Sequence, residues 1–505
     1  MNDPDLHLLV DDHEIVSYVN LERVLNRPRK HPEPVIRVEH PWEGYRAQAW
    51  GSVLREPNGL IRCWYFGFPA RQEDQPDAGG YCYAESRDGI HFEKPELGIA
   101  EFRGSKKNNL WYPMSPDGKN LTERELARQR RGLPAYDENG DPIGVVNNMD
   151  GLTVVRDDDD PDPARRYKLV ANMQDHAMWA DFYREQYPDI SAEDIARARD
   201  VVFGQYLDTS PDGIHWERKP RRMVPARYGD YMMVTRDERN RRWWLNERGR
   251  TLTGRNVALR TGTDFTDWSQ PELVFDNQEE SGFGRQFQWH GGMTPFNYGN
   301  QNLGLLEKWS NAGFGDTCEL ISQREGRQWE RVAPGKPFLD IGPEGSFDRF
   351  LIYPTHNAPI RIGDELYLYY TGAAAMSDGS TEDCPGEPMA IGVATIRLDR
   401  FAGLAHRLFE PGQLLMRPMQ ITRPHIDINA SPLFHGKLSL SIQRLDETPF
   451  EGFDFDDCQV NVYEDKIRNR IRWKNKADLS ELIGQTAYLH FRIDGCILYS
   501  FRFAE

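Results

Sequence analysis

The chain has 505 residues, a length typical of two or three domains. Its formal net charge is -17, and so acidic a surface repels nucleic acid and anionic membranes, so neither is expected as a partner. No apolar run approaches the roughly 20 residues of a membrane-spanning helix. The acidic first residues lack the layout of a signal peptide. A cytoplasmic protein is therefore expected, unless a leader has been removed.

The six cysteines are scattered along the chain, without the Cys-x-x-Cys or Cys/His spacing of a metal site. Buried free thiols in a reducing compartment are the expected state. No metal and no other cofactor is predicted.

A strand-turn-strand unit recurs along the first part of the chain. Ser86–Phe92 and Ser210–Trp216 share the pattern Ser-x-Asp-Gly-Ile-His-aromatic, and looser copies lie at Gly262–Trp268 and Ser322–Trp329. The Asp-Gly pair forms a tight turn because glycine accepts a positive φ. Such a unit cannot bury both of its own faces, so it stacks on further copies of itself.

Two β-patterned runs precede each of the four units, and a fifth pair occurs without an Asp-Gly-aromatic turn after it. In chain order the runs are 50–54 and 62–67, 151–155 and 167–172, 231–235 and 242–246, 291–296 and 303–307, and 352–360 and 365–372, the last pair being followed by 389–398. Short strands at this spacing predict an all-β, five-bladed β-propeller over residues 1–404. Residues 117–143 and 174–200 are expected to be insertions in blade 2, the second with a helix over 191–199.

The period changes after residue 404. Residues 405–505 contain the alternating runs 437–445, 486–493 and 496–503 without the turn motif, which predicts a separate C-terminal β-sandwich. Trp42 and the segment before it, residues 8–25, are expected to lead into blade 1, and this segment is expected to lend a strand that closes the ring.

These motifs resemble those of a known group. The Asp-Gly turns, Pro41-Trp42-Glu43, the Gly-Ser-Phe-Asp segment ending at Asp348 and the final strand ending in Phe503 resemble bacterial proteins similar to glycoside hydrolase family 32. The chain is also similar to propeller enzymes of families 43 and 130. The resemblance covers nearly all of the chain and implies a glycoside-acting propeller. The Trp-Met-Asn-Asp-Pro-Asn-Gly nucleophile motif of family 32 has no counterpart in blade 1.

Glycoside hydrolysis needs two carboxyl groups that flank the scissile bond. At the starts of inner strands the sequence offers Glu43 in blade 1, Asp150 in blade 2 and Asp230 in blade 3. Asp150 is the strongest candidate, because it directly precedes an apolar run and matches the group's second-blade aspartate. Glu247 and Glu307 end second strands, where a long side chain could reach inward as the acid. The alternative for each carboxylate is a cap on its own turn.

Further residues are candidates for substrate contact. They are His290, His356, Asp348, Arg349, Trp50, Trp289 and Trp309. The histidines could instead be buried residues with satisfied hydrogen bonds, and the tryptophans could be core residues. Arg349 could instead pair with a neighbouring acid, which is the favoured interpretation. The acidic run Asp157–Asp160 is expected to be a solvated hairpin loop, since it lacks the spacing of a calcium loop.

The leading hypothesis is a glycoside hydrolase that acts on a furanoside, such as a fructoside or an arabinoside. One alternative is a glycoside phosphorylase, whose phosphate would meet Arg227, Arg349, His290 and His356. The other is a non-catalytic carbohydrate-binding propeller. A carbohydrate is the expected partner in each case. The sugar, the linkage, the stereochemical outcome and the oligomeric state stay open.

Overall fold

The computed structural model describes most of the chain. The described residues are 2–44, 46–49, 51–68, 80–112, 149–174, 188–189, 191, 203–218, 221–227, 232–251, 254–276, 288–310, 315–374, 389–407, 409–458 and 460–505. In this part of the chain every regular element is a strand, apart from the short 3-10 turns η1 (Pro41–Glu43), η2 (Pro163–Arg165) and η3 (Ser480–Leu482). The helix expected over 191–199 lies outside the described residues, except for Ser191.

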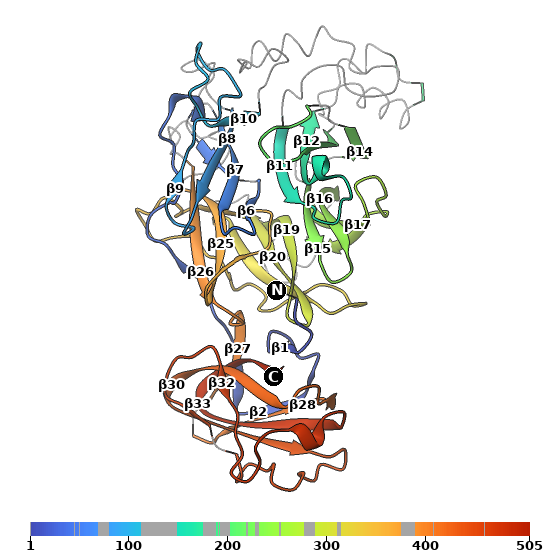
Figure 1. The fold of residues 1–505 in the computed structure, drawn as a ribbon, viewed down its shortest axis with the longest axis vertical. Coiled ribbons are helices and arrows are strands. Elements are labelled where there is room, and N and C mark those ends of the chain that lie inside the picture. Colours follow the sequence, from blue (N-terminus) through green and yellow to red (C-terminus); the bar gives the residue numbers. More distant parts are fainter. Residues whose placement is uncertain are drawn as a thin grey trace.

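Five sheets of four to six strands form the propeller, in the upper part of Figure 1. Blade 1 consists of β5 (Arg46–Gln48), β6 (Val53–Arg55), β7 (Ile61–Phe68), β8 (Gly80–Ser86), β9 (Phe92–Glu93) and β10 (Leu110–Tyr112). Blade 2 consists of β11 (Met149–Arg156), β12 (Tyr167–Gln174), β13 (Phe203–Ser210) and β14 (Arg221–Arg227). Blade 3 consists of β15 (Met232–Asp237), β16 (Arg242–Thr251), β17 (Gly254–Gly262) and β18 (Glu272–Phe275).

The remaining blades follow the same antiparallel order. Blade 4 consists of β19 (Gln288–Tyr298), β20 (Gln301–Ser310), β21 (Thr317–Gln323) and β22 (Glu330–Arg331). Blade 5 consists of β23 (Leu351–Pro354), β24 (Ile360–Ile362), β25 (Glu365–Ala373), β26 (Ala390–Arg397) and β4 (Arg29–Lys30). The predicted five-bladed, all-β architecture is confirmed.

The Asp-Gly turns have the expected chemistry. In the first copy Ser86 Oγ accepts from Gly89 N at 2.9 Å, and Asp88 Oδ1 accepts from the amides of Ile90 and His91 at 2.9 and 2.8 Å. The glycine has a φ of 83°, which a side chain would strain. The second copy, around Asp212, repeats these contacts. The motif therefore encodes the same turn in two blades.

The ring is closed by an N-terminal strand, but by residues 29–30 and not by the predicted segment 8–25. The short strand β4 pairs antiparallel with β26 and forms the outer edge of blade 5. Lys30 Nζ then lies 2.7 Å from Asp348 Oδ2, which also accepts from Tyr370 OH at 2.8 Å. A buried ion pair thus fastens the first strand of the ring to its last blade.

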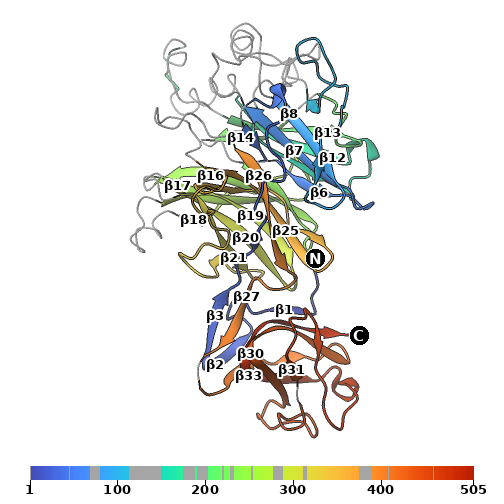
Figure 2. The same cartoon turned by 90° about the vertical axis from the view of Figure 1, so that its left-hand side faces the viewer.

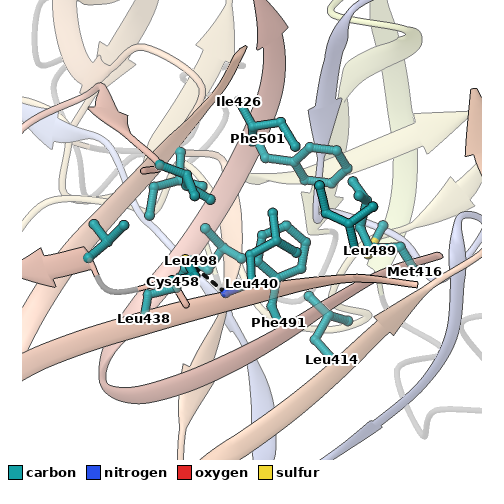
Figure 3. Close-up of a cluster of buried hydrophobic side chains, with 14 of the residues drawn as sticks. Leu414, Met416, Ile426, Leu438, Leu440, Cys458, Leu489, Phe491, Leu498 and Phe501 are labelled. Atoms are coloured by element: carbon teal, nitrogen blue, oxygen red, sulfur yellow. Dashed lines mark hydrogen bonds between the residues drawn. The ribbon is translucent and has the colours of Figure 1, made fainter. Parts of the chain in front are cut away.

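The C-terminal domain is a curved β-sandwich around one apolar core. Its strands are β27 (Ala402–His406), β28 (Gly412–Met416), β29 (Met419–Gln420), β30 (His425–Gln443), β31 (Val460–Val462), β32 (Asn469–Arg470) and β33 (Thr486–Ala504). The long strands β30 and β33 pair along most of their length, with register shifts after Asn429 and Pro432 where they bend. Between the layers lie buried side chains such as Leu440, Phe491 and Phe501 (Figure 3).

The N-terminus extends this sandwich. The strands β1 (Leu6–Leu8), β2 (Ile15–Val19) and β3 (Leu21–Leu25) pair with β33, β28 and β27. Figure 2 shows them beside the C-terminal strands. The sequence-based division assigns residues 1–25 to the propeller. In the structure this segment pairs with strands of the sandwich instead. Their apolar residues Leu9, Ile15 and Leu21 bury in the sandwich core.

Candidate functional site at the propeller axis

The first strand of each blade lies toward a common axis. Neighbouring blades are joined there by hydrogen bonds between small polar groups. Going round the ring, these bonds join Ala49 N to Thr371 Oγ1 (3.0 Å), Val154 N to Ser52 Oγ (3.2 Å), Thr153 Oγ1 to Met233 Sδ (3.0 Å) and Thr294 Oγ1 to His356 Nδ1 (3.2 Å). Neighbouring blades are therefore joined by buried hydrogen bonds as well as by apolar packing.

Blade 4 places a buried carboxylate against its inner strand. The register of β19 and β20 shifts between His290 and Met293, which leaves Gly291 and Gly292 as an irregularity at the start of β19. Glu307 on β20 is only 3% exposed. A Cβ on Gly291 would lie 2.4 Å from Glu307 Oε1, so glycine is what allows the carboxylate to reach the inner strand.

Blade 2 repeats this irregularity at the start of its inner strand. Asp150 is the second residue of β11, and the register of β11 and β12 shifts between Met149 and Leu152. Gly151 has a φ of 96°, a conformation that favours glycine. Irregularities of this kind redirect side chains next to functional sites. The backbone of Asp150 is among the described parts of the chain, but its side chain is not.

Trp309 lies two residues beyond Glu307, on the same face of β20. The Arg255 guanidinium stacks on its ring at 4.3 Å from the centroid, and the ring packs partly against the apolar cluster around Leu351 and Tyr353. Its backbone pairs with that of Trp289 at the start of β19. Trp50 and the side chain of Trp289 lie outside the described residues.

Glu43 occupies a different setting in blade 1. Its carboxylate is fully buried and accepts from the amides of Glu39 and His40, both at 2.8 Å, and from Tyr65 OH at 2.5 Å. Lys94 Nζ lies 2.8 Å from Oε1. This set of donors holds the turn η1 in place. The structure does not bring Glu43 into contact with any other predicted site residue in the described part of the chain.

Glu247 is held by an arginine. Arg260 Nε and Nη2 lie 2.9 and 3.3 Å from its two carboxylate oxygens, and both side chains are buried. Residues 243 and 245 on the same face of β16 pack toward blade 2. Glu247 is therefore an ion-paired group between blades 2 and 3. Asp230 lies outside the described residues.

The two histidines are buried in different places. His290 lies near Phe275, Lys308 and Arg331, and its pKa is held well below the ordinary value by burial and then by these cations. His356 lies at the axis, where burial and then Arg248 lower its pKa to about 3. Both imidazoles are therefore neutral at physiological pH.

Asp348 and Arg349 are adjacent in the chain but have separate roles. Asp348 is buried in the ring-closing pair with Lys30. Arg349 Nη1 lies 3.4 Å from Glu344 Oε1, a mostly exposed carboxylate. The favoured interpretation of Arg349 as a partner of a neighbouring acid agrees with this contact.

Sequence reasoning overlooked Arg248, which follows Glu247 on β16. Strand alternation places the two side chains on opposite faces, so Arg248 lies toward His356. It is 8% exposed. The sequence does contain a signal for Arg248, namely the pair Glu-Arg at the end of a second strand. Adjacent side chains of a strand point to opposite faces, so one of these two long side chains must face the inner strand of the next blade.

The acidic run in blade 2 surrounds the ammonium group of Lys168. Lys168 Nζ lies 3.5 Å from Asp157 Oδ2 and 2.5 Å from Asp160 Oδ2. This buried ammonium thus pairs with two of the four aspartates in the run. Within the described ranges, no group of three or more His, Cys, Asp and Glu side chains is arranged to hold a metal ion. Nor does the described part of the chain contain a helix long and apolar enough to cross a membrane.

Comparison with known proteins shows a likeness in fold only. No protein-family model and no curated protein matches the chain. Among solved structures, β-1,2-mannobiose phosphorylase from Listeria innocua is 12% identical with a TM-score of 0.44, over 75% of this chain and 98% of that one. The Bombyx mori GH32 β-fructofuranosidase BmSUC1 is 10% identical with a TM-score of 0.40, over 95% of both chains.

The α-L-arabinofuranosidase PaAbf62A from Podospora anserina is 12% identical with a TM-score of 0.41, over 74% of this chain and 98% of that one. Identities and TM-scores this low assign no activity. The fold assignment rests on the sheets described above.

Proposed function

We propose that the chain is a glycoside-acting enzyme, with hydrolysis of a furanoside as its reaction. The observation that supports this most is the position of Glu307, a buried carboxylate that lies over Gly291 at the start of an inner strand. Asp150 begins the inner strand of blade 2 with the same kind of backbone irregularity. Hydrolysis of a glycosidic bond needs two carboxyl groups, and Glu307 and Asp150 are the pair that we propose.

In this proposal Glu307 is the general acid. It protonates the glycosidic oxygen as the bond to the anomeric carbon breaks. Asp150 either attacks the anomeric carbon or activates water, and a separation of about 5 Å or about 6.5–9.5 Å between the carboxyl groups decides between retention and inversion. Asp230 stays a proposed third carboxylate, and Trp309 a proposed stacking surface for the sugar.

Glu43 and Glu247 fit structural roles better. The oxygens of Glu43 accept from two backbone amides and Tyr65 and are paired with Lys94, and those of Glu247 are held by Arg260. A general acid must be able to reach the substrate, and these contacts hold both carboxylates against neighbouring groups of the protein. We therefore assign the acid to Glu307, whose carboxylate lies over the irregular start of the inner strand of blade 4.

Phosphorolysis is the second candidate, and Arg248 favours it. Arg248 is buried and its charge lowers the pKa of His356, and a buried guanidinium is a suitable contact for an attacking phosphate. The furanoside preference itself rests on the resemblance to families 32 and 43.

The test is turnover of a panel of aryl furanosides and pyranosides and natural oligosaccharides, each with and without inorganic phosphate. Release of free sugar without phosphate, lost in Glu307→Gln and Asp150→Asn but kept in Glu481→Gln, supports the hydrolase. Glu481 is an exposed sandwich residue and serves as the matched control. Phosphate-dependent turnover favours the phosphorylase. Sugar binding without turnover in either condition overturns the enzyme proposal.

A further inference from the structure

A polar cavity lies between the propeller and the sandwich, away from the axis. It encloses about 500 Å³. Its walls come from three parts of the chain: the N-terminal residues 2–6, the ends of propeller strands around Tyr298 and Asp399, and the last residues of the sandwich. A ligand in this cavity would touch both domains at once.

Three arginines face this cavity with unused hydrogen-bonding capacity. Arg502 Nη2 is paired with Asp3 at 3.2 Å, but its Nε is buried without a hydrogen-bond partner. Arg468 forms no hydrogen bond or ion pair with the described residues. Arg361 donates only to the backbone oxygen of Gly363, at 3.1 Å. The lining also includes Asp3, Asp5, Asp399 and Glu505, so its acidic and basic side chains balance in number. Arg361 and Arg468 are exposed and have no ion pair with the described residues, and their guanidinium groups are the part of the lining that can bind an anion.

The fourth arginine of the cavity is already neutralised. Arg423 is bound by Asp5 at 3.2 Å and by Glu505 at 2.6 Å. It therefore helps to close the wall rather than to bind. The unused donors are those of Arg361, Arg468 and Arg502.

The cavity also contains an acceptor. Asp399 is 8% exposed, and its Oδ1 accepts from Tyr298 OH at 2.7 Å. The residue has a φ of 66°, so the backbone is held in the left-handed region that only glycine adopts easily. A buried carboxylate beside arginines that carry unused donors suits a ligand that has hydroxyl groups as well as a negative charge.

We propose that this junction cavity binds an anionic monosaccharide, that is, a sugar bearing a phosphate or a carboxylate group. The guanidinium groups of Arg361, Arg468 and Arg502 bind the oxyanion, because their planar donors match its oxygens. Asp399 accepts from a sugar hydroxyl. The volume is within the range of small-ligand sites. This inference goes beyond the activity proposed for the axis and does not depend on it.

Binding in the cavity stabilises the junction of the two domains, because the ligand binds the folded chain alone. The experiment is thermal unfolding and titration calorimetry of the full chain with D-glucose 6-phosphate, D-glucuronate, inorganic phosphate and D-glucose, at ionic strength matched with potassium chloride. We expect one of the two anionic sugars to raise the Tm saturably by at least about 2 °C. The preferred sugar identifies the phosphate or the carboxylate as the bound group.

Two variants locate the effect. Arg468→Ala and Arg361→Ala each remove a side chain without an ion pair in the described chain, so they leave the fold intact, and each is expected to weaken binding at least about tenfold. Arg87→Ala, an exposed arginine of the first Asp-Gly turn, is the control and binds as the parent does. Unchanged affinity in both cavity variants overturns the proposal, as does the absence of saturable binding by either anionic sugar. Equal affinity for inorganic phosphate and the sugar phosphate overturns the assignment of a sugar.

Discussion

Blades 1 and 4 each bury a glutamate close to the start of an inner strand, but the two carboxylates have different surroundings. Glu43 accepts from backbone amides and Tyr65 and is paired with Lys94, so every one of its oxygens is committed to the turn η1. Glu307 lies against Gly291, where the inner strand lacks a side chain. The first arrangement fixes a loop, whereas the second brings a carboxylate to the inner strand of blade 4.

The difference shows that burial of a carboxylate does not by itself indicate chemistry. Donors on every side hold a carboxylate in one position. A site carboxylate needs a route to the ligand, which glycine at the facing position supplies. Variants at these positions distinguish the role of Glu43 in blade 1 from that of Glu307 in blade 4.

Glu307→Gln is expected to have the largest effect, a fall in kcat/KM of about 10³-fold, because the amide cannot donate the proton that the leaving group needs. The Tm is expected to change by less than about 2 °C. Steady-state kinetics and a thermal scan check the two parts. A folded variant with unimpaired turnover removes Glu307 from the mechanism.

Glu43→Gln is expected to lower the free energy of unfolding by about 3 kcal/mol, because Lys94 loses its buried partner and a carboxylate in a dense donor network becomes an amide. Urea unfolding measures the change. The folded fraction is expected to keep its kcat within about threefold. A large loss of kcat in stably folded protein would return Glu43 to the catalytic candidates.

Gly291→Ala is expected to reduce kcat/KM by about 10²-fold, because the new Cβ displaces the Glu307 carboxylate from the inner strand. Glu307 and Gly291 should then act together, so the double variant Gly291→Ala, Glu307→Gln is no slower than Glu307→Gln alone. Kinetics of the four proteins test this. Additive losses would contradict the proposed contact.

The smallest effect concerns pH. His356 has a pKa of about 3 in the folded chain, well below the ordinary histidine value. The unfolded chain therefore binds more protons in the range between these two pKa values, and stability falls as pH decreases through it, by up to about 1.4 kcal/mol per pH unit for each such histidine. Urea unfolding between pH 7 and pH 5 measures this slope, which His356→Asn should reduce. An unchanged slope in this variant would contradict a buried neutral His356.

Much of the fold could be predicted because its signals are local. The Ser-x-Asp-Gly turns around Asp88 and Asp212 use hydrogen bonds within a few residues, so they are visible in any short window of the sequence. The alternation of residues in β33 likewise shows a half-buried strand. The pairing of residues 6–25 with the sandwich joins the two ends of the chain, and no local pattern encodes such a contact.

The site was harder to predict, for a related reason. Position at the end of a second strand marked both Glu247 and Glu307, but only the facing residues separate them: Arg260 for one and Gly291 for the other. Glu43 has the same ambiguity, since its partner Lys94 is distant in the chain. The favoured pairing of Arg349 with a nearby acid was easier, because Glu344 lies only five residues away.

The most direct test of the central claim compares leaving groups. A general acid matters when the leaving group is a poor one and hardly matters when it leaves without a proton. If Glu307 is the acid, Glu307→Gln loses about 10³-fold in kcat/KM on a methyl glycoside but less than about tenfold on the 2,4-dinitrophenyl glycoside of the same sugar. Equal losses on both substrates would contradict the account and give Glu307 a structural role.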